Sequence, residues 1–203
     1  MAGFTVIPLL MVFYYGLTDR SGAFTLANIL AIGSSEHLKA LWLSLLLAGV
    51  STVICLVLAY PLALILRKRH IGKGSFVVFI FILPMWMNFL LRTMAWQTLL
   101  EKNGVINTFL TLLHLPNVAI INTPAAIILG MVYNFLPFMV LPIYNTLVKI
   151  DDNVINAARD LGADNYQTLT KILIPLSVPG IVSGLTMVFV PALTTFVISN
   201  LLG

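Results

Sequence analysis

The stretch that decides how this chain folds runs from residue 151 to residue 179 and reads DDNVINAARDLGADNYQTLTKILIPLSVP. It holds four of the seven carboxylates of the 203-residue chain, Asp151, Asp152, Asp160 and Asp164, and long apolar segments flank it on both sides. A polar island of this length, in a sequence that is 60% hydrophobic, predicts a water-exposed element between two membrane-spanning segments.

The composition places the whole chain in a membrane. Only 9% of its residues are charged, against about 25% in soluble domains, and no soluble fold could cover this much apolar surface. The apolar runs are continuous rather than alternating, which favours an all-α membrane protein. The formal charge of +4 reflects a shortage of acids rather than a basic arm, so no nucleic-acid partner is expected. Cys55 is the only cysteine, which excludes a disulfide framework.

Five segments are predicted to cross the bilayer as helices, because unpaired backbone groups are costly in hydrocarbon. They belong to one transmembrane domain, residues 1–203, and comprise residues 2–17, 38–66, 76–100, 124–148 and 176–202, with a loop at 149–175 between the last two. Prolines inside the spans predict kinks at Pro84, Pro137 and Pro142. The pair Gly180 and Gly184 predicts a close helix–helix contact in the fifth span.

The placement of Lys and Arg predicts the orientation. Seven of these cations lie in two loops on one side of the predicted membrane, namely Arg67, Lys68, Arg69, Lys73, Lys149, Arg159 and Lys171. Three lie on the other side, Arg20, Lys39 and Lys102, with Arg92 expected near that face and Trp96 beside it as an interfacial anchor. This bias predicts that both basic loops and the N-terminus are cytoplasmic.

The polar island is expected to form two short helices separated by a break. Asp151 or Asp152 can cap the first helix, and Gly162 can end it in the left-handed conformation. Asp164 or Asn165 can cap the second. Further on, Pro175 and Pro179 are expected to interrupt regular helix until the fifth span begins.

The first of these helices contains Ala157 and Ala158. Two small side chains let another surface approach closely, so an exposed helix with this pair could fit into a groove on a partner. The alternative is a helix that lies on the bilayer surface, in which Ala is simply a good helix former.

The island resembles the cytoplasmic loop of the membrane subunits of ABC importers, whose pattern is Glu-Ala-Ala, three residues, Gly, nine residues, Ile, one residue, Leu-Pro. The same spacing places Asn156, Ala157, Ala158, Gly162, Ile172, Ile174 and Pro175 on that pattern. Asn156 stands where the family has Glu, which removes a charge that could pair with a partner, and Ile174 stands for Leu.

Further segments are similar to the polyamine branch of these permeases, the spermidine/putrescine type. They are residues 83–86, 92–96, 104–107, 133–138 and 142–144. The resemblance implies a six-helix ABC type I importer core, of which Gly203 would fall just before the last helix. We therefore expect the last helix to be absent from this sequence and its five spans to belong to a longer protein.

The resemblance implies a transport subunit rather than an enzyme, in the bacterial cytoplasmic (inner) membrane. It would form half of a pore with a second permease, dock two cytoplasmic ATP-binding subunits, and receive solute from an extracytoplasmic substrate-binding protein. The residues implied for coupling to the ATPase are Asn156, Ala157, Ala158, Asp160, Gly162, Ile172 and Pro175. The chain has no phosphate-binding Gly-rich loop with Lys-Ser/Thr, so a partner would bind the ATP. No cofactor and no metal site are expected.

A cationic solute would favour carboxylates or aromatic faces along its path. No Asp or Glu lies in a predicted span, and the candidates for a translocation path are Trp86, Asn88, Tyr133, Asn134 and Tyr144. Two alternatives stay open at this point: a permease of the same superfamily for another small solute, and a truncated membrane remnant that transports nothing.

Overall fold

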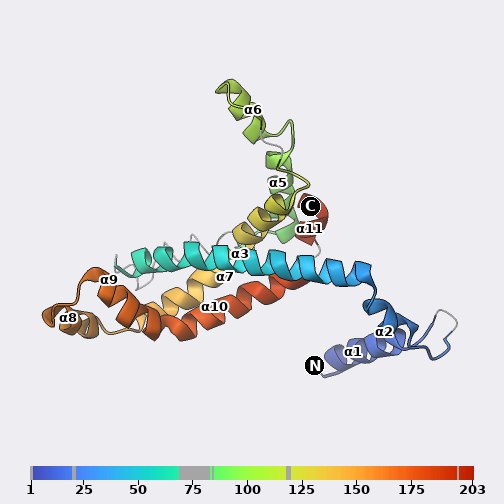
Figure 1. Ribbon diagram of the computed structural model, residues 1–203, viewed down its shortest axis with the longest axis horizontal. Helices are drawn as coiled ribbons and strands as arrows, with labels where there is room; N and C mark the ends of the chain where they lie inside the picture. The colour runs from blue at the N-terminus through green and yellow to red at the C-terminus, as the bar shows by residue number, and fades with distance from the viewer. Residues whose placement is uncertain (1, 20–21, 69–82, 84, 118–119, 196) are drawn as a thin grey trace. The chain divides into compact units, whose positions relative to one another are not determined.

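The computed structural model describes residues 2–19, 22–68, 83, 85–117, 120–195 and 197–203 (Figure 1). Its helices are α1 (Ala2–Gly16), α2 (Ala27–Ile32), α3 (Ser35–Lys68), α5 (Phe89–Leu100), α6 (Val105–Leu112), α7 (Pro124–Val148), α8 (Asp152–Asp160), α9 (Asn165–Thr168), the π-helix η1 (Leu169–Leu173), α10 (Ile174–Thr194) and α11 (Val197–Leu202). Within these ranges the β-structure is a single isolated bridge between Thr18 and Phe24. The all-α prediction agrees with this architecture.

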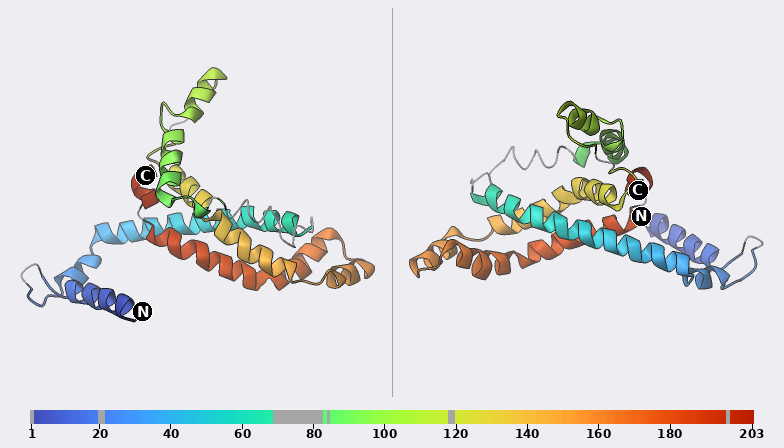
Figure 2. Two further views of the ribbon diagram at one scale, coloured as in Figure 1. Left: turned by 180° about the vertical axis from the view of Figure 1, so that it is seen from behind. Right: turned by 45° about the horizontal axis from the view of Figure 1, so that its top comes forward.

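Contacts within the chain divide it into two units, residues 1–46 and residues 47–203. The first unit contains α1, α2 and the beginning of α3, and its apolar side chains are largely exposed. The second unit contains the buried core and the whole loop at residues 149–175. In this unit α3, α7 and α10 run alongside one another, and α8 and α9 lie at one end (Figures 1 and 2).

The core of the second unit is built on α7, whose side chains Met139, Val140, Ile143 and Leu147 are all almost fully buried. Against it, α10 presents Gly180 and Gly184. A Cβ added at Gly180 would lie 2.7 Å from the Pro142 carbonyl oxygen and 2.5 Å from the Thr146 hydroxyl. The two helices therefore touch at backbone distance, and the predicted Gly-mediated contact is confirmed.

Helix α3 contributes a stripe of small residues to the same core. Ala48, Cys55, Ala59 and Ala63 are fully buried and recur at intervals of two, one and one helical turns. Small side chains at this spacing let helices pack closely where no aqueous hydrophobic effect drives them together. A hydrogen bond between two hydroxyl groups joins α3 to α10, with 3.0 Å between Tyr60 Oη and Ser177 Oγ.

Three helical stretches among the described residues are long and apolar enough to cross a bilayer: Ser35–Lys68, Pro124–Val148 and Asn165–Thr194. The helix predicted at 124–148 has those bounds, the one at 38–66 is longer at both ends, and the one at 2–17 is the shorter apolar helix α1. Of the third predicted span, residues 76–82 and the expected kink at Pro84 lie outside the described residues, and α5 is its second part. The number of spans stays a prediction.

The expectation of one continuous helix over residues 176–202 is wrong. Helix α10 ends at Thr194, Thr195 is extended with φ −78° and ψ 111°, and α11 starts at Val197. Pro191 lacks the N–H that would bond to the preceding turn, and the Thr194 hydroxyl donates to the Val190 carbonyl at 3.1 Å. Both features weaken the last turn of α10, so the helix stops there.

The expectation that Pro175 and Pro179 interrupt regular helix is also wrong. The chain stays helical from α9 through η1 into α10, and the Ile174 amide donates five residues back to the Leu169 carbonyl. A proline ring clashes with the carbonyl four residues earlier and offers no N–H. The wider π turn directly before Pro175 makes room for its ring, and Pro179 is accepted inside α10.

Candidate functional site

Both ends of α8 are fixed by local hydrogen bonds. The Asp151 carboxylate accepts from the Asn153 amide at 2.9 Å, so Asp151 is the cap. At the other end Gly162 has φ +85°, its amide donates to the Arg159 carbonyl at 2.9 Å, and the Ala163 amide donates to the Ala158 carbonyl at 3.0 Å. This pair of bonds is a Schellman motif, and the predicted role of Gly162 is confirmed.

The cap of the second short helix, α9, lies two residues after Gly162. The Gln167 amide donates to the Asp164 carboxylate at 2.6 Å, and the Gln167 side-chain carbonyl accepts from the Asp164 amide at 3.3 Å. This reciprocal capping box identifies Asp164 as the cap of α9. Because a Schellman motif and a capping box follow one another directly, the connection between α8 and α9 has little freedom to change its angle.

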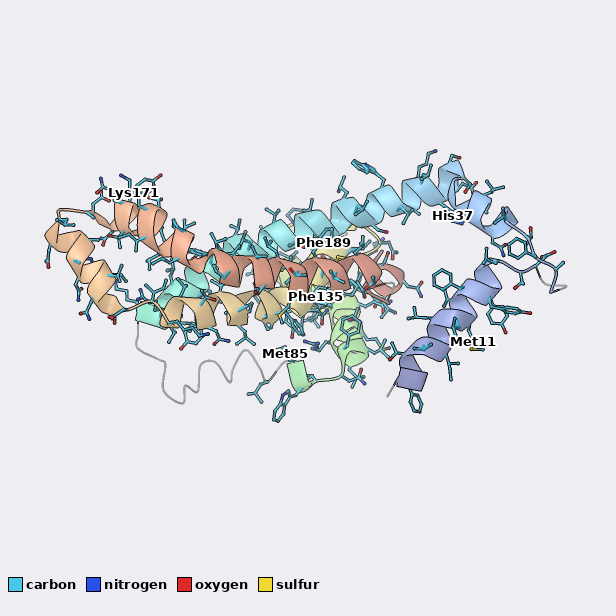
Figure 3. All side chains as sticks on the ribbon, turned by 90° about the horizontal axis from the view of Figure 1, so that it is seen from below. Met11, His37, Met85, Phe135, Lys171 and Phe189 are labelled. Atoms are coloured by element: carbon cyan, nitrogen blue, oxygen red, sulfur yellow. The ribbon has the colours of Figure 1, made fainter. Side chains whose placement is uncertain are left out.

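The outer face of α8 consists of Val154, Ala157 and the C-cap residue Leu161. All three are exposed, Leu161 at 89%, although they recur at the spacing of one helix face. The sticks in Figure 3 show the side chains of α8, and of the segment in which Lys171 is labelled, standing out from the end of this unit. An exposed apolar face around a small residue on a doubly capped helix is suited to docking another protein.

The inner face of α8 points towards α3 and α9. Ile155 is buried, and it lines a groove of about 540 Å³ together with Leu64, Arg67, Lys68, Asp152, Asn156, Arg159, Asn165, Thr168, Leu169 and Leu173. The groove has a mixed lining: α3 and α8 both contribute cations, α8 adds a carboxylate, and α8 and α9 add amide side chains, over apolar side chains. Asn156, which stands where the resembling family has Glu, lies on this inner side next to the outer face.

The structure brings together most of the predicted coupling residues. Asn156, Ala157 and Asp160 are exposed on α8, Ala158 is half-buried, and Gly162 is the exposed residue that ends it. Ile172 lies half-buried in η1, and Pro175 lies in the first turn of α10. Their role in coupling stays a prediction.

The candidates for a translocation path fall into separate places. Tyr133 packs edge-on against Trp96, with ring centroids 5.3 Å apart, and both line a cavity of about 420 Å³ with Ile54, Ala125, Ile128, Leu129 and Val132. Trp86 and Asn88 do not line it: Trp86 is 76% exposed, and Asn88 caps α5 by accepting from the Leu90 amide at 2.9 Å.

The remaining two candidates, Asn134 and Tyr144, are buried in α7. The Asn134 side-chain amide donates to the Gly130 carbonyl at 2.9 Å, while its Oδ1 has no hydrogen-bond partner among the described residues. A buried acceptor without a donor is costly. Among the five candidates, Asn134 therefore has a buried acceptor, Oδ1, that could receive a hydrogen bond from a solute.

Arg92 is folded into the protein rather than extended from it. Its side chain is 7% exposed, and within the described ranges its Nε and Nη1 have no hydrogen-bond partner. The prediction placed Arg92 at the outer interface with Trp96, and its depth in a bilayer stays a prediction. In the described part of the chain no group of three or more His, Cys, Asp and Glu side chains could hold a metal ion.

Two residues of this region were missed by sequence reasoning. Arg67 lies in a basic turn whose sequence pattern indicates only membrane orientation, yet its side chain reaches the start of α8. The sequence predicts an interfacial anchor at Trp96, whereas in the structure Trp96 packs on Tyr133. In both cases the partner is far away in sequence, and no local spacing could have revealed it.

Comparison with known proteins places these features in context. Residues 42–203 match the family described as binding-protein-dependent transport system inner membrane component. The chain is 35% identical over 209 residues to the spermidine/putrescine transport system permease protein PotB of Haemophilus influenzae, covering 98% of this chain and 73% of that one. The Escherichia coli protein of that name is 38% identical over 208 residues, covering 98% and 76%. The inner membrane ABC transporter permease protein YdcU of E. coli is 32% identical over 193 residues, covering 88% and 62%.

Proposed function

The chain belongs to the family of binding-protein-dependent transport system inner membrane components, and on that premise we propose that it forms half the pore of an ATP-driven polyamine importer. The observation that carries the proposal is the extent of the similarity: two relatives named as spermidine/putrescine permeases align with 98% of the chain. A family of transport components moves solute rather than catalysing a reaction. ATP hydrolysis is therefore assigned to two cytoplasmic partner subunits, and solute delivery to an external binding protein.

The docking element for the ATPase is α8. Its outer face, Val154, Ala157 and Leu161, is apolar and exposed, and this supports a contact that excludes water. The caps at Asp151 and Gly162 support a rigid element, because a helix frayed at either end would absorb a push instead of transmitting it. The five-span arrangement and a second permease subunit complete the proposed pore.

The cavity beside Tyr133 supports recognition of a cation without a carboxylate. Helices α5, α7 and α10 contain no Asp or Glu, so a polyamine ammonium passing them would find aromatic faces instead. Tyr133 is 39% exposed and is held edge-on by Trp96, which fixes the plane of its ring. A cation over such a face gains about 0.5–2 kcal/mol.

Uptake by proteoliposomes containing the whole transporter tests the substrate. We expect ATP-dependent accumulation of labelled spermidine or putrescine that stops when the binding protein is omitted. Accumulation of another small solute, with no uptake of either polyamine, would contradict the polyamine assignment while keeping the transport assignment. No ATP-dependent uptake of any solute would contradict both.

Capture of the ATPase subunit tests the docking face. Leu161→Ser is expected to weaken capture of the purified ATPase by the permease because it removes the most exposed apolar side chain of the outer face. Leu112→Ser is the matched control, since Leu112 is also exposed, at 75%, but lies on α6 outside the loop. Equal capture by both variants would contradict docking through this face.

Labelling of a cysteine placed at Asp160 tests the orientation. Asp160 is exposed and Cys55, the one native cysteine, is buried, so a membrane-impermeant maleimide will report the new thiol. We expect labelling of Asp160→Cys only after the membrane is opened. Labelling of intact cells from outside would reverse the topology and with it the proposed contact to a cytoplasmic motor.

A further inference from the structure

The junction between α7 and α8 is held from a third helix. Helix α7 ends at Val148, and only residues 149–151 separate it from the first residue of α8. Arg67, in the last turn of α3, donates through Nη2 to the Ile150 carbonyl at 2.9 Å and to the Asp152 carboxylate at 2.9 Å. One guanidinium group thus forms hydrogen bonds to both the linker and the first residue of α8.

The charges in this contact match the helix ends on which they lie. Arg67 is a cation at the negative end of the α3 dipole, and Asp152 is an anion at the positive end of the α8 dipole. The Arg67 side chain is 13% exposed and that of Asp152 is 63% exposed. The bond to the Ile150 carbonyl is therefore better shielded from water than the ion pair, and it is the more persistent of the two.

Helix α8 has a separate connection to each of three long helices. The short linker joins it covalently to α7, and the capped turn followed by α9 and η1 joins it to α10. Towards α3, by contrast, the groove lined by Leu64 and Ile155 opens between the two helices. Arg67 reaches across this groove, so it supplies a non-covalent connection between α3 and α8.

We propose that Arg67 is a positioning residue that transmits a displacement of α8 to α3. This inference rests on the proposed function, because the displacement is the one that the ATPase imposes on the outer face of α8. Since Arg67 lies on the inner side, its loss leaves the ATPase contact intact. A transporter without it hydrolyses ATP at its usual rate and moves less solute for each ATP.

The test measures ATP hydrolysis and solute uptake on the same proteoliposomes of the complete transporter. Arg67→Gln is expected to lower solute moved per ATP by about tenfold, the scale of one lost hydrogen bond to a charged group. Arg67→Lys retains the charge and one bond and should restore part of this loss. Asp152→Asn keeps the bond to Ile150 and should lower the ratio by only about twofold, as expected for an exposed ion pair.

Lys68→Gln is the matched control, because it removes the same charge one residue further along, from an exposed side chain. It should leave the ratio unchanged. The double variant Arg67→Gln with Asp152→Asn should behave as Arg67→Gln alone, since both changes remove the same contact.

Amide exchange gives a second readout that does not depend on transport. In Arg67→Gln, exchange of the amides of residues 149–153 should accelerate by about tenfold, and in Lys68→Gln it should not. A normal uptake-to-ATP ratio with unchanged exchange in Arg67→Gln would overturn the inference. So would an equal loss of hydrolysis and uptake. Absence of ATP-driven uptake by the wild-type transporter would instead overturn the proposed function on which the inference rests.

Discussion

The contact between α7 and α10 and the connection between α8 and α9 reach rigidity by opposite means. The first relies on backbone approach: Gly180 leaves no room for a side chain over the Pro142 carbonyl. The second relies on hydrogen bonds within a few residues, from the Schellman motif at Gly162 and the capping box at Asp164. The first region should be destabilised by an added side-chain atom. The second should be destabilised by loss of a local hydrogen bond or by a residue that disfavours the left-handed backbone conformation.

The largest effect on stability is expected at Gly180. Gly180→Ala places a Cβ 2.7 Å from the Pro142 carbonyl oxygen, and a backbone atom cannot move aside. We expect a loss of about 1–3 kcal/mol, typical of overpacking. Gly184→Ala is the milder comparison, because the nearest atom to its Cβ is the side-chain Met139 Sδ at 2.7 Å and the nearest backbone atom, the Met139 carbonyl oxygen, is further away at 3.3 Å. Thermal unfolding in detergent measures both, and equal stabilities would contradict the importance of backbone approach.

The next largest effect on stability is expected at Gly162. A side chain there is disfavoured by the backbone conformation and not by contact with other atoms. No atom lies within 4 Å of an added Cβ, but φ is +85°. Gly162→Val should cost about 1–2 kcal/mol locally and lower the uptake obtained per ATP. Gly162→Asn, which tolerates this conformation better, should retain more of the coupling. Normal uptake by the Val variant at normal membrane levels would remove the idea that α8 acts as a stiff element.

A smaller effect is expected at Asp164. Asp164→Ala removes the bond from the Gln167 amide to the Asp164 carboxylate and leaves the bond from the Asp164 amide to the Gln167 side chain. It should destabilise the start of α9 by about 1 kcal/mol, whereas Asp164→Asn keeps a side-chain acceptor. The measurement is amide exchange at residues 165–168. Exchange in Asp164→Ala as slow as in the unchanged chain would show that the Asp164 side chain is not the cap that holds the connection.

The smallest effect on stability is expected at Leu161. Its side chain is 89% exposed, so Leu161→Ala should change the stability of the isolated chain by less than about 0.5 kcal/mol. Its effect should appear only in the presence of the ATPase. A large loss of stability in the isolated chain would mean that Leu161 packs within its own protein and would argue against an open docking face.

The local part of the fold could be predicted from sequence because its causes are local. Asp151, Gly162 and Asp164 each act on a bond within a few residues, and their residue types reveal that action. The Gly180–Gly184 contact was predictable for the same reason, since its spacing is that of one helix face. The family resemblance then predicts that the exposed loop docks an ATPase, and this role stays a prediction.

The long-range part could not be predicted in this way. Arg67 and Asp152 are 85 positions apart, and each had a sufficient local explanation as a topology signal and a helix cap. Trp96 and Tyr133 meet only because α5 packs on α7. The continuous helix through Pro175 was missed because a π turn accommodates what an α turn would reject.

That widened turn, η1, sets the angular relation between two parts of the molecule. It holds one residue more per hydrogen-bonded ring than α-helix does, and each residue of an α-helix advances the chain by about 100° around its axis. With one residue fewer between Leu169 and Leu173, everything ahead of it would be rotated by that angle about α10. Leu161 and Val154 would then face a different direction about the α10 axis. The one additional residue in the π turn therefore sets the orientation of the loop relative to α10.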